Sequence, residues 1–363
     1  IFSWIEKSSR CSFNKSHAVA YAICSYWSAY CKAHHTDDFF VAYLYYANEK
    51  QDSQDEVREL ISEAKLFDIE TKTPNITFFK DKFHFTEGKI YFGVKDIKSL
   101  TGKTGDKVIQ SVNEMETELK KTADNFFWVE ILLYLSAKIN STAFKALASV
   151  GFFRGFKDKV TRNSALYEYE IYKNLTKAET AWLVEHYPKK RWKTLISALQ
   201  DLAPIKKEGG GTHRVERSQL VQNEIQLLEH PPYDLSDDPS WIVDQETRLL
   251  GCPVSMAKVE TSDTSGANST CKEIVNGKTG ANLQVAVNIK RVSDYKINKG
   301  KSKGKTMAFL TVEDETCSMD SVVVFPDCRD KHQYIMYEGN NIIMRGKASK
   351  SDNSFIVNAI YEI

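Results

Sequence analysis

Apolar and polar positions divide the chain into a helix-rich first part and a strand-rich last part. Aromatic and apolar residues crowd residues 16–50, which predicts a helical core buried on nearly every face. Residues 53–66 repeat apolar positions at helical spacing, whereas residues 76–94 alternate and predict a small hairpin. Residues 177–202 are predicted to be helical, with a break at Pro188.

The pattern changes to short alternating segments after residue 280. They predict five strands, with a short helix between the third and the fourth, which is the order of an OB-fold barrel. The predicted fold class is therefore α+β and multidomain, with mainly helical regions followed by a C-terminal five-stranded OB-fold β-barrel. The strands are expected around residues 285–289, 307–312, 322–325, 341–346 and 355–361.

Composition limits the function classes. The 363 residues carry a formal net charge of +1, so nucleic acid would have to be bound by local basic patches. No apolar run has the length of a membrane span. The 7 cysteines include no Cys-x-x-Cys pair, which argues against a disulfide framework or a zinc ribbon and suits a reducing cytoplasm. Cys24 and Cys31 are expected in the core, and Ile1 lies within an amphipathic pattern, as expected for a piece of a longer protein.

A compact polar cluster precedes the first helix. Asn14, Lys15, Ser16 and His17 offer hydrogen-bond donors and a fixed positive charge within four residues. Ser16 can cap the helix, and a helix start beside a lysine can bind an anion such as phosphate. The alternative is an ordinary capped helix with a solvated lysine.

The sequence around this cluster resembles one protein family. The run Phe13–Ala22, followed by a tyrosine-rich stretch and Lys32-Ala33-His34, is similar to the bacterial C-family replicative DNA polymerases, the polymerase III alpha subunits. The similarity continues through Pro74-Asn75-Ile76 and Lys89–Gly93. The resemblance implies the C-terminal portion of such a subunit. It divides the chain into the end of the fingers and the little finger (1–95), a helix-hairpin-helix and helical region (96–202), a linker and connecting segment (203–280) and the OB-fold domain (281–363).

The resemblance also implies two DNA-contacting helical hairpins. The first, in residues 97–112, departs from the family because Gly102 stands one position late, so its DNA contact is in doubt. The second, in residues 139–153, follows the family more closely, and Gly151 is expected to adopt the backbone shape that needs no Cβ atom. Lys145, Gly151 and Arg154 are the predicted duplex-binding residues. Without the resemblance, this segment is a short helix with a glycine at its C-terminus.

A lysine-rich loop follows the first predicted barrel strand. OB-folds bind single strands through this loop and the middle strands, and aromatic side chains stack on the bases. One or two of the three aromatic candidates are expected in the core, and the alternative for the whole loop is a solvated surface. The predicted single-strand-binding residues are Tyr295, Lys296, Lys299, Lys301, Lys303, Lys305, Phe309 and Phe325.

Catalytic chemistry is not predicted within this chain. Gly-Lys-Thr occurs three times without the earlier glycine of a phosphate-binding loop. The family holds two Mg²⁺ ions on palm carboxylates that precede the fingers, so no catalytic or metal-binding residue is assigned here. The residues 313–315 are expected to be solvated carboxylates. The basic run 189–193 is expected to be a solvated face, with Trp192 as a weak candidate for base stacking.

The resemblance implies a part in template-directed DNA synthesis. The implied partners are primer-template DNA, single-stranded template, deoxynucleotides and other replisome subunits, with no membrane. The chain alone is expected to bind DNA and not to polymerise. Two alternatives stay open: a non-enzymatic single-strand-binding accessory protein, and an RNA-binding module like the anticodon-binding domains of aminoacyl-tRNA synthetases.

Overall fold

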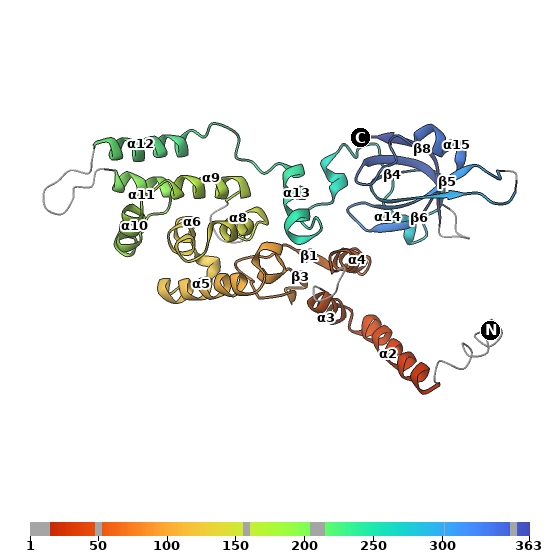
Figure 1. The fold of residues 1–363 in the computed structure, drawn as a ribbon, viewed down its shortest axis with the longest axis horizontal. Coiled ribbons are helices and arrows are strands. Elements are labelled where there is room, and N and C mark those ends of the chain that lie inside the picture. Colours follow the sequence, from red (N-terminus) through yellow and green to blue (C-terminus); the bar gives the residue numbers. More distant parts are fainter. Residues whose placement is uncertain (1–14, 48–52, 155–159, 204–214, 301, 349–353) are drawn as a thin grey trace, which may run out of the picture.

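The computed structural model describes residues 15–47, 53–154, 160–203, 215–300, 302–348 and 354–363. Helices form an elongated body, and the last part of the chain forms a five-stranded barrel beside it (Figure 1). The helix α13 (Pro239–Leu250) lies between the two parts. The predicted fold class, a helical region followed by a five-stranded barrel, is confirmed.

The helical body contains the predicted helix 53–66 and the predicted hairpin. Strand β2 (His84–Thr86) pairs antiparallel with β3 (Lys89–Tyr91), and β1 (Glu70–Lys72) adds to β3 in parallel. Short turns η1 (Val94–Asp96), η2 (Lys98–Leu100) and η3 (Ala123–Asn125) connect the elements, and a π-helical turn η4 (Ile131–Leu135) joins α6 to α7. The helices are α2 (Lys15–His34), α3 (Thr36–Ala47), α4 (Ser53–Leu66), α5 (Lys103–Leu119), α6 (Trp128–Glu130), α7 (Ser136–Lys138), α8 (Ser141–Ser149), α9 (Arg162–Lys173), α10 (Lys177–Lys190), α11 (Leu195–Leu202), α12 (Val215–Glu229) and α13.

One continuous apolar core runs through this body, from Phe40 of α3 to Cys252 after α13. Near its centre the ring of Phe144 stacks on the ring of Tyr169, with centroids 4.0 Å apart and planes 12° apart. This contact fixes α8 against α9, because offset aromatic pairs add to the free energy of apolar burial. The region between residues 215 and 250 is therefore part of the folded body rather than a simple linker, since Val221 and Leu249 are buried in the same core.

The barrel is closed in the strand order β4-β5-β6-β8-β7. Val285, Val287 and Ile289 alternate into its core, as the sequence pattern predicted. The predicted helix between the third and fourth strands is α15 (Pro326–His332), and the short elements η5 (Lys258–Thr261) and α14 (Cys271–Val275) precede the barrel. The strands are β4 (Gly280–Lys296), β5 (Thr306–Glu313), β6 (Ser318–Val324), β7 (Asn341–Ala348) and β8 (Phe355–Glu362).

Helix α4 joins the helical body to the barrel. Ser62 Oγ donates a hydrogen bond to Ser318 Oγ at 2.9 Å, and Lys272 Nζ lies 2.5 Å from the carboxylate of Asp68. Leu66 packs against the barrel core. The barrel is therefore held against an element that lies more than two hundred residues earlier in the chain.

Helix α2 is present, but the prediction that its aromatic residues are buried is wrong. None of its residues is buried, and Tyr26 and Trp27 are 66% and 63% exposed. Cys24 and Cys31 are exposed on the same helix, although they were expected in the core. Figure 1 shows the reason, because α2 extends away from the body beyond α3. An apolar pattern reports that a surface is suited to burial and does not identify the surface that covers it.

Two predictions for residues 177–202 are also wrong. Pro188 does not break α10, which continues to Lys190 and ends with Arg191 in the left-handed region (φ 52°). Trp192 is not available for base stacking, because it is buried and its Nε1 donates to Asp201 at 2.9 Å. Pro188 lacks the N–H that would bond the carbonyl four residues earlier, and α10 ends only two residues after it, so the proline lies in the last turn and does not interrupt the helix.

The residues 313–315 are not uniformly solvated. Asp314 is buried and accepts hydrogen bonds from the backbone N–H groups of Cys271 and Cys317, at 2.6 and 3.1 Å. Glu313 is half-buried and paired with Lys290 at 2.5 Å. The carboxylate of Asp314 therefore accepts from backbone N–H groups at the start of α14 and in the turn before β6, so its role is structural.

We expect thiol reagents to separate the cysteines into two classes. Burial raises the pKa of Cys252 to about 12 and that of Cys271 well above its usual range. This lowers the thiolate fraction of Cys252 by roughly three orders of magnitude relative to an ordinary thiol, so Cys24 and Cys31 should react first. Maleimide labelling at about pH 8, followed by peptide mass spectrometry, should show Cys252 modified only after denaturant is added. Equal labelling of Cys252 and Cys24 in the native protein would contradict this burial.

Candidate nucleic-acid interface

The outer face of the barrel carries a row of side chains that crosses four strands. Ser293 of β4 is paired with Phe309 of β5, which is paired with Val323 of β6 and, through it, with Ile356 of β8. The residues on either side of Phe309 are buried in the barrel, so Phe309 itself points outward. The row therefore places three apolar side chains, Phe309, Val323 and Ile356, next to Ser293 on the outer surface of the barrel.

All three predicted stacking residues lie on the outside of the barrel. Tyr295, Phe309 and Phe325 are 48%, 40% and 47% exposed, so the expectation that one or two of them belong to the core is wrong. Tyr295 and Phe309 are neighbours, with ring centroids 6.3 Å apart. Exposed flat rings beside each other are suited to stacking against bases.

The lysine-rich loop forms the tip of the β4–β5 hairpin. Ile297 N donates to Lys305 O at 2.9 Å, and Gly304 N donates back to Ile297 O at 2.8 Å, which closes the turn. Gly300 and Gly304 have φ angles of 88° and 89°, a region that side chains with a Cβ atom rarely adopt. The sequence therefore places glycine where the hairpin must turn and lysine between those positions.

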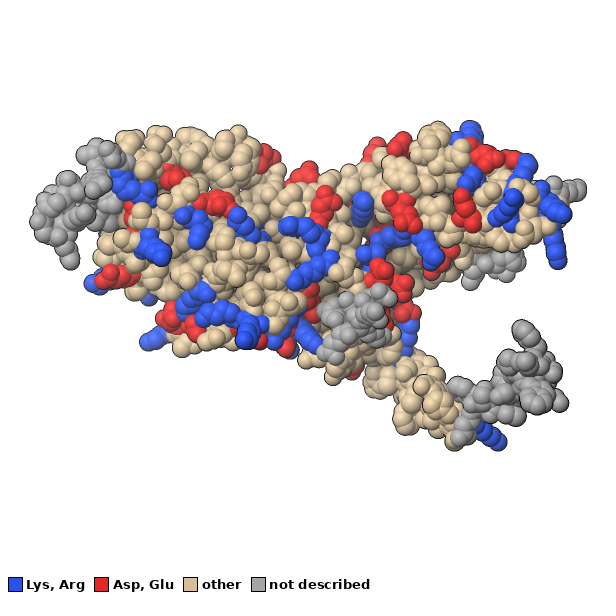
Figure 2. All heavy atoms as spheres, in the orientation of Figure 1, with Lys and Arg blue, Asp and Glu red and all other residues tan. Residues whose placement is uncertain are grey.

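Most of the described lysines of this hairpin have no acidic partner. Lys296, Lys299 and Lys303 are exposed, and within the described part of the chain no carboxylate lies in ion-pair distance of them. Lys305 is the exception, since its Nζ lies 3.0 Å from the carboxylate of Asp327. Lys301 lies outside the described residues. Figure 2 shows Lys and Arg side chains gathered at this end of the barrel.

A bidentate ion pair supports the base of the hairpin. Arg329 of α15 donates from Nε and from a terminal nitrogen to the two carboxylate oxygens of Asp294, at 2.9 and 2.5 Å. The hydrogen bonds and charge of Arg329 lower the pKa of Asp294. Helix α15 is thereby fastened to β4 next to the aromatic residues.

The duplex-binding residues predicted on the helical body lie around the end of α8. Gly151 has φ 78°, and a Cβ atom there would lie 2.8 Å from Arg154 Cδ and 3.0 Å from Arg162 Nε. The positive φ confirms the predicted backbone shape of Gly151, and the close contacts of a Cβ atom there are a further finding. Arg154 is exposed, whereas Lys145 is exposed but paired with Glu170 at 2.5 Å. Of the two cations, Arg154 is the freer to meet an anion.

A second cluster of basic residues lies around the start of α5 and was not predicted from the sequence. Lys98, Lys103 and Lys107 are exposed around the start of α5. Lys103 and Lys107 line a hollow of about 330 Å³ that reaches Asn140 at the start of α8. Figure 2 shows a concentration of blue side chains along this edge of the body. The sequence signal for this site is the four-residue spacing of Lys103 and Lys107, which places both lysines on one face of a helix.

The polar cluster before α2 is described only in part. Asn14 lies outside the described residues, and α2 already includes Lys15, so Ser16 stands within the helix rather than at its cap. The ring of His17 meets the edge of Tyr21, with centroids 4.6 Å apart. The described part of the cluster, residues 15–17, is therefore helical, and the ring of His17 packs against Tyr21.

The structure does not bring the three predicted sets of residues into one site. The start of α2, the end of α8 and the tip of the β4–β5 hairpin lie on separate parts of the molecule in Figure 1. Within the described ranges, no group of three or more His, Cys, Asp or Glu side chains could hold a metal ion. No described helix is long and apolar enough to cross a membrane.

Comparison with known proteins relates the chain to one bacterial enzyme subunit. No protein-family model matches it. DNA polymerase III subunit alpha of Aquifex aeolicus is 37% identical over 158 residues, which are 43% of this chain and 13% of that protein. The same subunit of Borreliella burgdorferi is 23% identical over 366 aligned positions, covering 98% of this chain and 28% of that protein. That of Buchnera aphidicola is 26% identical over 359, covering 97% and 27%.

Proposed function

From the homology of this chain to a segment of the bacterial DNA polymerase III alpha subunits, we propose that it is the C-terminal DNA-binding part of a replicative DNA-directed DNA polymerase. The chain spans between 13% and 28% of the length of these relatives, so the activity of the whole subunit is part of the proposal. The observation that carries it is the set of exposed aromatic side chains on the barrel, beside a hairpin whose Lys296, Lys299 and Lys303 form no ion pair within the described part of the chain.

Single-stranded template is bound by the barrel in this proposal. The strand order and the helix between β6 and β7 fit an OB-fold, whose middle strands and first hairpin are the usual single-strand surface. Tyr295, Phe309 and Phe325 stack on bases, and the hairpin lysines attract the phosphates. Each stacked base contributes about 1–3 kcal/mol, whereas each lysine adds affinity that falls with salt.

Duplex DNA is held by the helical body. Arg154 beside Gly151 meets the backbone of the primer-template, and Lys145 can contribute if a phosphate replaces Glu170 as its partner. Lys103 and Lys107 at the start of α5 add a second contact, because the N–H groups of a helix start and two lysines favour the same anion. The late glycine of the first hairpin therefore does not prevent DNA contact there.

Nucleotide chemistry takes place outside this chain. Lys15, Ser16 and His17, together with Asn14, lie nearest the incoming deoxynucleotide in the proposal, where a positive charge and donors suit its phosphates. Two Mg²⁺ ions, held by carboxylates in another part of the polymerase, activate the primer 3′ hydroxyl for attack on the α-phosphate. The proposed partners are primer-template DNA, single-stranded template, deoxynucleotides and other replisome subunits, in the cytoplasm.

The proposal is tested by binding and by primer extension with the purified chain. We expect labelled single-stranded DNA of about 20 nucleotides to bind, and the logarithm of its affinity should fall linearly with the logarithm of the salt concentration. Primer extension should be absent with this chain alone, because the metal-binding carboxylates lie elsewhere. No affinity for any oligonucleotide in low salt would overturn the proposal, and extension by the chain alone would overturn the assignment of chemistry.

The same titration separates the alternatives. A clear preference for RNA over DNA of the same sequence would favour the synthetase-type RNA-binding module. The second alternative is an accessory single-strand-binding protein. It would be favoured if the chain binds DNA as well as it binds RNA and does not stimulate primer extension by the Aquifex aeolicus polymerase on a primed template.

A further inference from the structure

A groove on the helical body has a chemistry that does not suit DNA. It lies between α9 and α12, and residues of the loop that leads into α13 also line it. Its volume is about 510 Å³, which is within the range of ordinary ligand sites. The lining residues include Leu166, Tyr167, Ile171, Glu224, Leu227, Pro232, Tyr233 and Trp241.

Aromatic side chains form two sides of this groove. The rings of Tyr167 and Tyr233 meet edge to face, with centroids 5.7 Å apart. Tyr167 Oη donates to Leu227 O at 2.9 Å, which holds the tyrosine of α9 against α12. Tyr233 remains 62% exposed, so its ring is presented at the mouth of the groove. Such aromatic faces attract cations as well as apolar groups.

Glu224 supplies a negative charge to the groove. Among the described residues no ion pair to it is formed, although Arg217 on the same helix is near enough to interact with its charge. Glu224 Oε1 accepts a hydrogen bond from Asn174 Nδ2 at 3.0 Å, whereas its Oε2 is shielded from water and has no hydrogen-bond partner. A shielded carboxylate oxygen without a donor costs free energy in the unbound protein. A small rotation of the carboxylate would turn this oxygen toward a donor placed in the groove.

The charge around the groove favours a cation over the phosphates of a nucleic acid. Glu224 lines it, and so does Glu170, whose charge is offset by Lys145. The exposed Asp234 follows Tyr233 in the same loop. A phosphate backbone would be repelled here, whereas a guanidinium or ammonium group would gain both the carboxylate and the aromatic faces.

We propose that the groove between α9 and α12 binds an arginine- or lysine-bearing segment of a partner protein, with apolar residues beside the cation. The cation meets Glu224, Tyr167 and Tyr233, and the flanking apolar residues contact Leu166 and Leu227. This site uses none of the proposed DNA-contacting side chains, although its Glu170 is the ion-pair partner of Lys145.

The test uses the full chain and a defined probe. The probe is a fluorescein-labelled peptide, Gly-Pro-Leu-Arg-Leu-Pro, and its matched control carries Gln in place of Arg. Fluorescence anisotropy should show that the Arg peptide binds at least about tenfold more tightly than the Gln peptide, as a charge-assisted hydrogen bond requires. Glu224→Gln should abolish this preference, because the amide keeps the bond from Asn174 and removes the charge.

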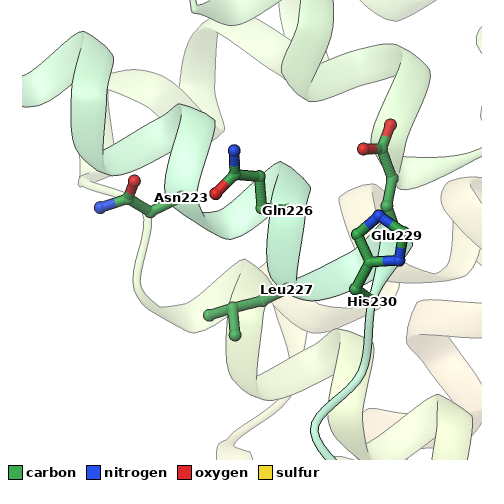
Figure 3. A pocket seen from close by; sticks show the side chains of 5 residues that line it. All are labelled: Asn223, Gln226, Leu227, Glu229 and His230. Atoms are coloured by element: carbon green, nitrogen blue, oxygen red, sulfur yellow. The ribbon is translucent and has the colours of Figure 1, made fainter.

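Glu229→Gln is the matched control variant. Glu229 lies on the same helix but lines the neighbouring shallow pocket with His230 and Gln226, shown in Figure 3. This variant should bind the Arg peptide as the unmodified protein does. Equal binding of both peptides, retention of the preference by Glu224→Gln, or displacement of the peptide by single-stranded DNA would each overturn the proposal.

Discussion

Replacing Glu246 with alanine is expected to lower the free energy of unfolding by about 3–5 kcal/mol, since it leaves a buried guanidinium unpaired. Arg162 and Glu246 form an ion pair at 2.6 Å, and both side chains are fully buried. Glu246 Oε2 also accepts the backbone N–H groups of Val254 and Ser255, at 2.6 and 2.8 Å. One substitution therefore removes the partner of a buried charge and the acceptor of two partly buried backbone donors.

Urea unfolding followed by circular dichroism measures this loss. Asp244→Ala is the matched control, because Asp244 is exposed on the same helix and its removal should change the unfolding free energy by less than about 0.5 kcal/mol. The double variant Arg162→Met with Glu246→Leu should recover much of the loss, since an apolar pair of similar size avoids the unpaired charge. Equal stability of Glu246→Ala and Asp244→Ala would show that the ion pair does not matter.

The ion pair also explains how the end of α8 is held. Arg162 donates to Ser149 O at 2.9 Å, and its Nε lies beside the position of Gly151. Because the guanidinium bridges Ser149 of α8 and Glu246 of α13, the corner that presents Arg154 is braced from both sides. A loss of the pair should therefore weaken duplex binding as well as folding.

Changing Lys296, Lys299 and Lys303 together to glutamine is expected to weaken single-stranded DNA binding by roughly 10²-fold at about 0.1 M salt. Each lysine that meets a phosphate contributes about 0.7 to the slope of log affinity against log salt, so three should lower the slope by about 2. Anisotropy titrations at several salt concentrations measure both quantities.

The control for this variant removes the same net charge elsewhere. Lys173, Lys177 and Lys193 are exposed on the helical body, and their change to glutamine should leave the single-strand slope unchanged. If both triple variants lose affinity equally, the binding is a general effect of charge and the hairpin has no special role.

The barrel was the most predictable part of the fold. Its strands alternate around a single core, so Val285, Val287 and Ile289 reveal both the strand and its inner face. The order of elements along the chain, five strands with a helix between the third and the fourth, was predicted from the sequence pattern, whereas the pairing order of the strands was not. The positive φ of Gly151 was also predictable, because the turn of the second helical hairpin requires a residue without a Cβ atom at this position.

Burial at single positions was less predictable. Trp192 is surrounded by lysines and an arginine in the sequence, yet Asp201 and the rings of Trp182 and Tyr187 enclose it. Asp314 stands between two glutamates, yet it caps α14 from forty-three positions away. Such partners are set by tertiary contacts, and no local pattern reports them.

The candidate site was predicted in parts. The exposed Tyr295 and Phe309 were found through their place in the barrel, whereas Glu224 and the groove beside it gave no sequence signal. That groove joins residues from two helices and a loop, and helix α12 looked like part of a linker. A site built from distant segments becomes visible only when the helices are packed.

The exposure of Trp27 gives the protein an internal optical probe. Trp128 and Trp192 are buried, and Trp182 and Trp241 are half-buried, so iodide should quench the emission of Trp27 more strongly than that of these four. Any molecule that settles on α2 should shield this fluorophore and shift its spectrum toward the blue. Contact at this helix can then be followed in real time without attaching a dye.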